Sequence, residues 1–220
     1  MKKFFIITLA TAILFSAGCT STKTNNMFYP MNQGSVWNYE TKLKTANGEK
    51  TFTSEVKAGQ QVNENGKPCT EMIYNSKSSV EVNKKEYYTL DNEKVQLVSS
   101  NFMGKKSIYD PPITILPAEK DSENNWDWSG KINGVQAFAK FTQTKGNMDT
   151  VIDGKNIAST KVTSVMVMAD DNTVITEDRY FAFEKGLIRS DATILEKNNP
   201  QHKIEINTIM KDCKITGVDK

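Results

Sequence analysis

The sequence predicts an all-β protein: a single curved antiparallel sheet, arranged as a half-barrel or a two-sheet sandwich, with little helix. Apolar and polar residues alternate along most of the chain, which is the period of a strand buried on one face. Asn-Gly and Asp-Gly pairs, which favour the tight turns of hairpins, separate several of these segments. About ten to twelve strands are expected, more than a flat open sheet holds without curling. A curled sheet either fills its concave face with side chains or leaves room for a ligand.

The first half of the chain is expected to form a meander of short strands. Segment 34–44 alternates between apolar and polar residues, and its expected inward residues are Trp37, Tyr39, Thr41 and Leu43. Asn47-Gly48 supplies a turn into a second strand, 51–58, with Phe52, Val56 and Ala58 inward. Further strands are expected at 70–75, 80–83, 86–90 and 94–99.

A proline-rich bend then separates two halves of one sheet system. The two prolines of Asp110-Pro111-Pro112 cannot donate hydrogen bonds to a ladder, so a bend or an edge is expected there. In the segment 174–183, Glu177 and Arg179 share a face with Phe181, so we expect these charges near solvent or paired across the strand. The strands expected after the bend are 126–132, 135–144, 148–153, 161–169, 173–183, 187–195 and 203–215.

The N-terminus has the layout of a cleaved secretory signal that ends at a cysteine. A basic start is followed by the apolar run 4–15 and by Ser16-Ala17-Gly18-Cys19, and the run is too short for a stable membrane span. Ordinary signal peptidase sites also follow small residues, but the polar stretch after Cys19 favours a lipoprotein. We therefore expect a signal peptide at 1–18, a lipidated Cys19, a polar tether at 19–28 and one antiparallel β domain at 29–220.

This layout predicts a protein held at a membrane by its N-terminal lipid, in the cell envelope and facing the periplasm or the cell exterior. In a cell with two membranes, Thr20 after the cysteine is compatible with the outer membrane. Acyl chains add about 0.8 kcal/mol of membrane affinity per buried methylene, so several chains on one cysteine hold a protein there. No later segment has the length of a membrane span.

Composition excludes some partners. Removing 1–18 takes two lysines and no acids from 28 basic and 26 acidic residues, so the remainder is balanced at 26 of each. A neutral surface with evenly mixed charges offers no basic patch for nucleic acid, so we expect no nucleic-acid partner. Cys69 and Cys213 are an even pair in an oxidising compartment, where they form either a disulfide or two buried thiols.

The sequence offers few residues suited to catalysis or to metal binding. His202 is the only histidine, it lies in a turn-like stretch, and no Gly-x-Ser-x-Gly motif is present. Neither Cys69 nor Cys213 has a second ligand at the spacing of a zinc site, and no loop has the ligand spacing of an EF-hand. We therefore expect no enzyme activity, no metal and no cofactor.

Two pairs of side chains are candidates for ligand contact. Trp126 and Trp128 project from the same face of one expected strand, and Met166 and Met168 do so from another. Such residues line apolar pockets or stack on sugars, but they also fill the cores of β domains.

Two motifs carry a family resemblance. Residues 29–39 contain Tyr-Pro-x-x-x-Gly-x-x-Trp-x-Tyr, which resembles the opening of many uncharacterised bacterial lipoproteins. Residues 180–188, Tyr-Phe-Ala-Phe-Glu-Lys-Gly-Leu-Ile, are similar to a hairpin of the same proteins, and Trp126-Asp127-Trp128 fits their usual order. The resemblance implies a curved antiparallel sheet of unassigned activity. More distantly, it implies an architecture like the LolA/LolB lipoprotein carriers, half-barrels that hold acyl chains on the concave face.

Two functional hypotheses follow. The first is a non-enzymatic, membrane-anchored envelope protein that binds an apolar or lipid-like ligand in its curved sheet. The alternative is an envelope module that contacts a protein or a glycan through an exposed Trp-x-Trp patch. The two differ in whether Trp126 and Trp128 are buried or exposed.

Overall fold

The computed structural model describes residues 26–76, 83–118, 125–152, 154–169 and 173–217. These residues form twelve strands and, within the described ranges, no helix. The strands are β1 (Val36–Thr45), β2 (Gly48–Glu64), β3 (Lys67–Ser76), β4 (Asn83–Asp91), β5 (Lys94–Phe102), β6 (Lys105–Leu116), β7 (Asn125–Ile132), β8 (Val135–Ile152), β9 (Lys155–Met168), β10 (Thr173–Ala182), β11 (Gly186–Glu196) and β12 (Asn199–Lys214).

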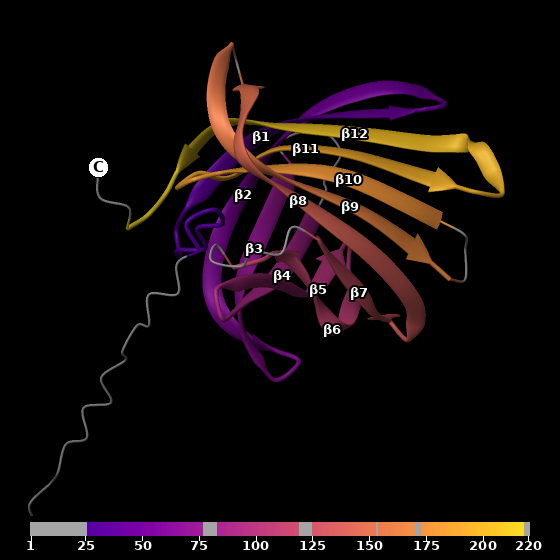
Figure 1. Ribbon diagram of the computed structural model, residues 1–220, viewed down its shortest axis with the longest axis horizontal. Coiled ribbons are helices and arrows are strands. Elements are labelled where there is room, and N and C mark those ends of the chain that lie inside the picture. Colours follow the sequence, from indigo (N-terminus) through magenta and orange to yellow (C-terminus); the bar gives the residue numbers. More distant parts are fainter. Residues whose placement is uncertain (1–25, 77–82, 119–124, 153, 170–172, 218–220) are drawn as a thin grey trace, which may run out of the picture.

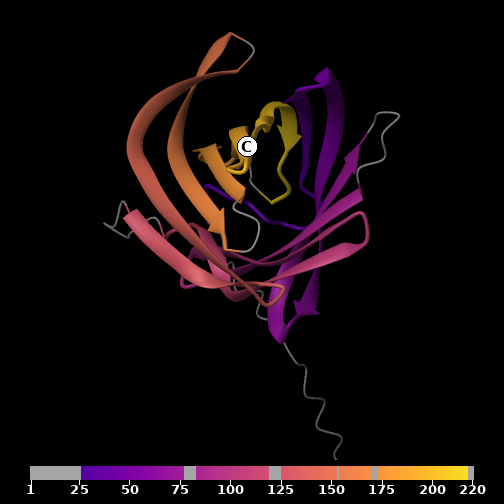
Figure 2. The same ribbon diagram turned by 90° about the vertical axis from the view of Figure 1, so that its right-hand side faces the viewer.

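Each strand pairs with its neighbours in the sequence, and the meander closes into a barrel where β1 meets β12 (Figure 1 and Figure 2). All of these pairings are antiparallel, so the predicted all-β antiparallel fold is confirmed. The sheet is closed, however, and not the half-barrel or sandwich that we expected. β1 and β12 pair from Val36–Lys214 to Lys44–Glu205, which satisfies backbone groups that an edge strand would leave open.

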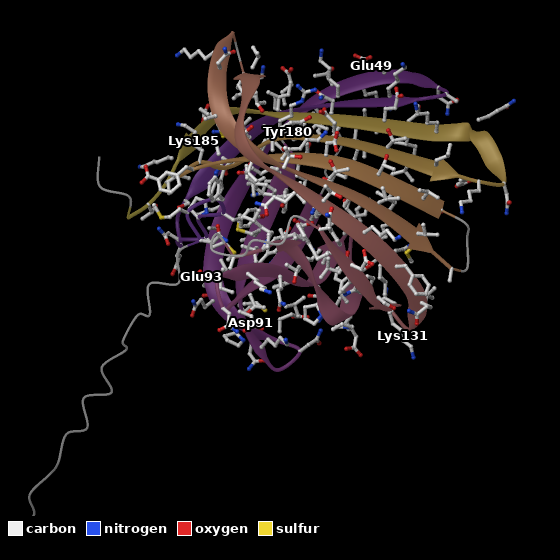
Figure 3. All side chains as sticks on the ribbon, in the orientation of Figure 1. Glu49, Asp91, Glu93, Lys131, Tyr180 and Lys185 are labelled. Carbon is white, nitrogen blue, oxygen red and sulfur yellow. The ribbon has the colours of Figure 1, made fainter. Side chains whose placement is uncertain are left out.

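The turns of the meander alternate between two ends of the barrel. The end that holds the β4–β5 and β10–β11 turns, at 91–94 and 182–186, is called the proximal end. The distal end holds the β1–β2, β5–β6 and β11–β12 turns. Glu93 and Lys185 mark the proximal end in Figure 3, and Glu49 and Lys131 lie toward the distal end.

The predicted alternation in the first hairpin is present. Trp37, Tyr39 and Thr41 are buried along β1, and the residues between them are half-buried. Val56 and Ala58 are buried in the same way on β2. The inward face of this hairpin therefore forms part of the core, as its sequence period predicts.

A strand break predicted in the second half of the chain is absent. The segments 135–144 and 148–153 were expected as two strands, but β8 runs without a break from Val135 to Ile152. A register shift between Thr144 and Met148 lies where we expected the break. The irregularity therefore takes the form of a register shift in the ladder between β8 and β9, and β8 continues past it.

The ladder between β6 and β7 is the weakest in the barrel. Among the described residues it contains two pairs, Tyr109–Ile132 and Asp110–Lys131. It stops where the prolines of the predicted bend begin, because a proline has no N–H to donate. We call this junction between β6 and β7 the seam.

The two tryptophans of the Trp-x-Trp motif bridge the seam from β7. The Trp128 indole Nε1 donates to the Pro111 carbonyl at 2.8 Å, and that of Trp126 donates to the Thr114 carbonyl at 2.9 Å. Gly130 makes room for this packing, since a Cβ atom there would lie 2.6 Å from the Trp128 ring. Side chains therefore supply bonds across the seam beyond the point where the ladder ends.

Candidate functional site

A segment that precedes the first strand closes the proximal end of the barrel. We call residues 26–35 the plug. The Asn26 amide donates to the Glu93 carbonyl at 2.9 Å, and the Glu184 N–H donates to the Met27 carbonyl at 2.8 Å. These bonds join the plug to the β4–β5 and β10–β11 turns. The first residues of the plug, which we placed in the tether, are thus packed on the barrel.

Two aromatic residues of the plug extend these contacts. The ring of Phe28 packs edge-on against Phe183, with 5.8 Å between centroids. Tyr29 enters the core and is 7% exposed. Its ring lies 5.3 Å from that of Tyr88 and 6.0 Å from that of Phe181. The plug is therefore anchored both on the rim of the barrel and in its interior.

The second half of the plug is fixed to the wall of the barrel. The Gly34 N–H donates to the Ala58 carbonyl and the Ala58 N–H donates to the Ser35 carbonyl, both at 2.9 Å. Pro30 packs on Gly186, where a Cβ atom would lie 3.4 Å from the proline ring. Gly186 also has a φ of +80°, a conformation that residues with side chains disfavour.

Inside the barrel, between the plug and the distal end, lies a cavity of about 270 Å³. Its wall comes from the plug, β1 to β4, β11 and β12. The buried part of the lining includes Tyr29, Pro30, Trp37, Tyr39, Val56 and Met72. The half-buried part includes Phe52, Ser54, Ser76, Lys84, Ile206 and Thr208.

Several polar atoms of the lining are already hydrogen-bonded within the protein. The Trp37 indole donates to the Lys185 carbonyl at 2.6 Å, and the Tyr39 hydroxyl donates to the Leu187 carbonyl at 2.8 Å. Two threonine hydroxyls of the lining, on β1 and β12, also bond each other at 3.0 Å. A molecule in the buried part of the cavity therefore meets mainly apolar side chains and aromatic rings.

Among the described residues of the lining, Lys84 is the charged one, and its charge is balanced by that of Glu86. Its ammonium lies 2.7 Å from the Glu86 carboxylate and 4.7 Å from the centre of the Tyr74 ring. The hydroxyls of Tyr74 and Tyr88 donate to the same carboxylate at 2.5 and 2.7 Å. The four side chains thus form one hydrogen-bonded cluster beside the cavity.

The ionisation of this cluster follows from its contacts. Burial alone would raise the pKa of Glu86, but the charge of Lys84 and the two tyrosine hydroxyls outweigh burial and hold the pKa below its usual value. Burial, with a smaller effect from the charge of Glu86, raises the pKa of the Tyr29 hydroxyl well above its usual value. At neutral pH the carboxylate is therefore charged and the tyrosine of the plug is neutral.

A second ion pair, largely buried, lies on β10. The Arg179 guanidinium lies 2.5 Å from the Glu177 carboxylate, and the two side chains are 25% and 18% exposed. The carboxylate also accepts a hydrogen bond from Ser190 at 2.7 Å. Burial would raise the pKa of Glu177, but Arg179 and Ser190 hold it below its usual value. Glu177 and Arg179 thus pair with each other along the strand rather than across it.

The four residues proposed from sequence for ligand contact lie elsewhere. Trp128 is 6% exposed, and Trp126 stacks on Phe141 with 5.1 Å between ring centroids. Met166 and Met168 are partly buried against the same core. None of the four lines the cavity described above. The exposed Trp-x-Trp patch of our alternative hypothesis is wrong, because both indoles are turned into the seam and the core.

Cys69 and Cys213 are free thiols in this structure, so the candidate disulfide is not formed. The strands that carry them, β3 and β12, are separated in the barrel by β1 and β2. Three strand spacings of about 4.8 Å exceed the Cα separation of a disulfide, which is at most about 7 Å. Burial raises the pKa of the Cys69 thiol to about 11, which keeps it protonated at neutral pH. Cys19, the expected lipidation site, lies outside the described residues.

Sequence reasoning missed Tyr29, Lys84 and Glu86. A signal for the last two was present, since Lys84, Glu86 and Tyr88 alternate in phase along β4. Charged residues in phase with a buried aromatic residue indicate an interior that is partly polar. Tyr29 precedes the first strand, so the alternation within strands gives no information on where its side chain points.

Within the described ranges, no helix has the length and apolar character needed to cross a membrane. In the same part of the chain, no three histidine, cysteine or acidic residues are grouped as metal ligands.

No protein-family model and no curated protein matches the sequence. Among solved structures, the chain is similar to a protein from Bacteroides fragilis that is assigned as exported and has a YmcC-like fold. The identity is 12%, the TM-score is 0.41, and the match covers 86% of this chain and 99% of that one. It is also similar to a protein from Parabacteroides distasonis assigned as a lipoprotein, with 16% identity, a TM-score of 0.44, and coverage of 86% and 98%.

A third match is a domain from Vibrio parahaemolyticus assigned as an outer membrane lipoprotein-sorting protein. Its identity is 10%, its TM-score is 0.31, and the match covers 90% of this chain and 89% of that one. Because the TM-score of each of these three matches is below 0.5, no argument about this chain is drawn from them.

Proposed function

We propose that this chain is a lipid-anchored protein of the cell envelope that binds an apolar or lipid-like small molecule inside its barrel and does not catalyse a reaction. The proposal of a bound ligand rests on the cavity of about 270 Å³ between the plug and the distal end. The anchor and the location follow from the signal-like segment that ends at Cys19.

The chemistry of the lining supports an apolar ligand. Protein pockets for small molecules are mostly apolar and start at about 300 Å³, close to the volume of this cavity. The buried lining offers rings and aliphatic side chains, and the polar atoms of Trp37 and Tyr39 are already bonded. Burying apolar surface contributes about 25 cal/mol per Å². Hydrocarbon contact is therefore the interaction that this cavity favours.

Filling the cavity should weaken binding. In Ser54→Trp the new indole occupies the cavity, whereas Thr53→Trp, one residue earlier on β2, places the same ring at an exposed position. We expect Ser54→Trp to weaken binding of a fluorescent fatty acid at least about tenfold, which corresponds to about 1.4 kcal/mol. Thr53→Trp should bind as the unaltered protein does. Equal binding by both variants would contradict the proposal, as would a failure of the unaltered protein to bind any apolar probe.

Removing the acylated residue should release the protein from the membrane. In Cys19→Ala no thiol remains for acyl chains to join, so the chain loses its hydrophobic anchor. After cell fractionation we expect the unaltered protein in the membrane pellet and the variant in the soluble fraction. A Cys213→Ala variant controls for the loss of a thiol. Membrane retention of Cys19→Ala at the level of this control would refute the anchor.

A further inference from the structure

We propose that the ligand enters the cavity tail first through the distal end of the barrel, so that an uncharged hydrocarbon chain is the inserted part and the head group stays at the distal mouth. This inference rests on the proposed function and adds to it the direction of entry and the chemical class of the inserted group. Three features carry it: the plug, the burial of the residues along the cavity, and the pairing of the interior charges.

The plug blocks the proximal end with several independent contacts. Its first residues are bonded to two different turns, through Asn26 to Glu93 and through Met27 to Glu184. Behind them, the buried ring of Tyr29 contacts rings from two strands that are far apart in the barrel, β4 and β10. A ligand entering from this end would have to displace a buried aromatic residue and break these bonds.

Most lining residues at the proximal end are buried, whereas several of those toward the other end are half-buried. Tyr29, in the plug, and Trp37, next to it, are 7% and 3% exposed. Phe52, close to the β1–β2 turn, and Lys84, the second residue of β4, are half-buried. Because both positions lie near distal turns, the cavity opens at the distal end, which is turned toward the viewer in Figure 2.

The paired charges inside the barrel determine which part of a ligand can enter the cavity. Lys84 is paired with Glu86, and Arg179 with Glu177, so each of these cations already has an anion. A charged head group taken to the bottom of the cavity would lose its hydration and find no unpaired opposite charge among these residues, which is unfavourable. A hydrocarbon chain has no such cost. At the mouth, by contrast, a head group keeps its contact with water.

The first test asks which end of the ligand is inserted. Two fatty acids of equal length are used, one with a dansyl group at the head and one with it at the tip of the tail. We expect the head-labelled probe to bind at least about tenfold more tightly, because the bulky fluorophore of the other cannot reach the bottom of the cavity. Equal affinities, or tighter binding of the tail-labelled probe, would overturn insertion by the tail.

The second test asks whether the proximal end admits the ligand. Met27→Cys/Glu184→Cys places two thiols on backbones joined by a hydrogen bond, so that oxidation locks the plug. The variant is made together with Cys213→Ser, because Cys213 is the more exposed of the two free thiols on the barrel. The reduced form of the same protein is the control. The association rate of the head-labelled probe is measured for both forms.

The third test places an obstacle at the distal mouth. Phe52→Cys, labelled with a bulky maleimide, carries the obstacle at the rim of the cavity. Thr51→Cys, labelled in the same way, carries it at an exposed position of the same strand. Both are made in the Cys213→Ser background, and the association rate of the same probe is measured.

We expect the locked and the reduced plug to give the same association rate, and labelled Phe52→Cys to slow association about tenfold relative to labelled Thr51→Cys. Loss of uptake on locking the plug, or equal rates for the two labelled variants, would overturn distal entry and leave the proposed function intact. A protein that binds neither fatty acid before any change would overturn the proposed function together with the inference.

Discussion

Replacing Trp128 with alanine is expected to lower the free energy of unfolding by about 3–5 kcal/mol, the range for large aromatic residues removed from cores. The side chain is 6% exposed and packs closely against Gly130. Its indole also supplies the hydrogen bond to Pro111, beyond the point where the ladder between β6 and β7 has ended. The variant therefore loses both packing and a bond across the seam. Denaturation in urea measures the change.

Phe138→Ala is the matched control for this prediction. Phe138 lies on the neighbouring strand, β8, where it pairs with Ser129, and it is 51% exposed. We expect this variant to change stability by less than about 0.5 kcal/mol, as is usual for surface positions. If Trp128→Ala were as mild as Phe138→Ala, the role of the indole in closing the barrel would be wrong.

Replacing Arg179 with methionine is expected to cost about 2–3 kcal/mol, because it leaves the carboxylate of Glu177 without its cation. Breaking a fully buried pair costs about 3–5 kcal/mol, and the remaining exposure of these two side chains lowers the expected value. The double variant Arg179→Met/Glu177→Gln removes both charges and should recover most of the loss. Thermal or urea denaturation of the three proteins measures it.

Lys203→Met is the control for the loss of a cation. It breaks a pair with Glu205 on the surface and should have no measurable effect on stability. An Arg179→Met variant as stable as this control, or a double variant as unstable as the single one, would show that Glu177 and Arg179 do not act as a buried unit.

The pH dependence of stability gives a second readout of the buried carboxylates, Glu177 among them. In the folded protein the pKa values of Glu86 and Glu177 lie below 4.5, the ordinary value that applies to the unfolded chain. Their contribution to stability is therefore complete above about pH 4.5 and is lost as the pH falls through the lowered values. Between pH 7 and pH 3, the double variant that lacks Glu177 should lose stability less steeply than the unaltered protein.

The alternation of residues was sufficient to predict the strands and, in the first hairpin, the inward face. Trp37 and Tyr39 are buried because one face of their strand is covered by the core. Residues on one face of a strand recur at every second position, so the alternation of apolar and polar residues indicates that face directly. Closure was not predictable in this way. It depends on the pairing of Lys44 with Glu205, which are far apart in the chain, and no local pattern encodes that register.

The candidate site was predicted poorly, for a physical reason. Trp126 and Trp128 are large and apolar, which suits a ligand pocket and a packed core equally well. Their indole N–H groups decide between the two, because the partners are carbonyl groups on the far side of the seam. The cavity itself depends on how far the plug reaches into the barrel, and Tyr29 gives no periodic signal of that depth.

The seam and the cavity lie on different parts of the barrel, and this separation has a mechanical consequence. Local opening of a barrel is expected first where two neighbouring strands share the shortest ladder, which here is between β6 and β7. The cavity is lined instead by β11, β12 and β1 to β4, and these strands are joined by longer ladders. Local opening at the seam is therefore expected to leave the strands around the cavity paired.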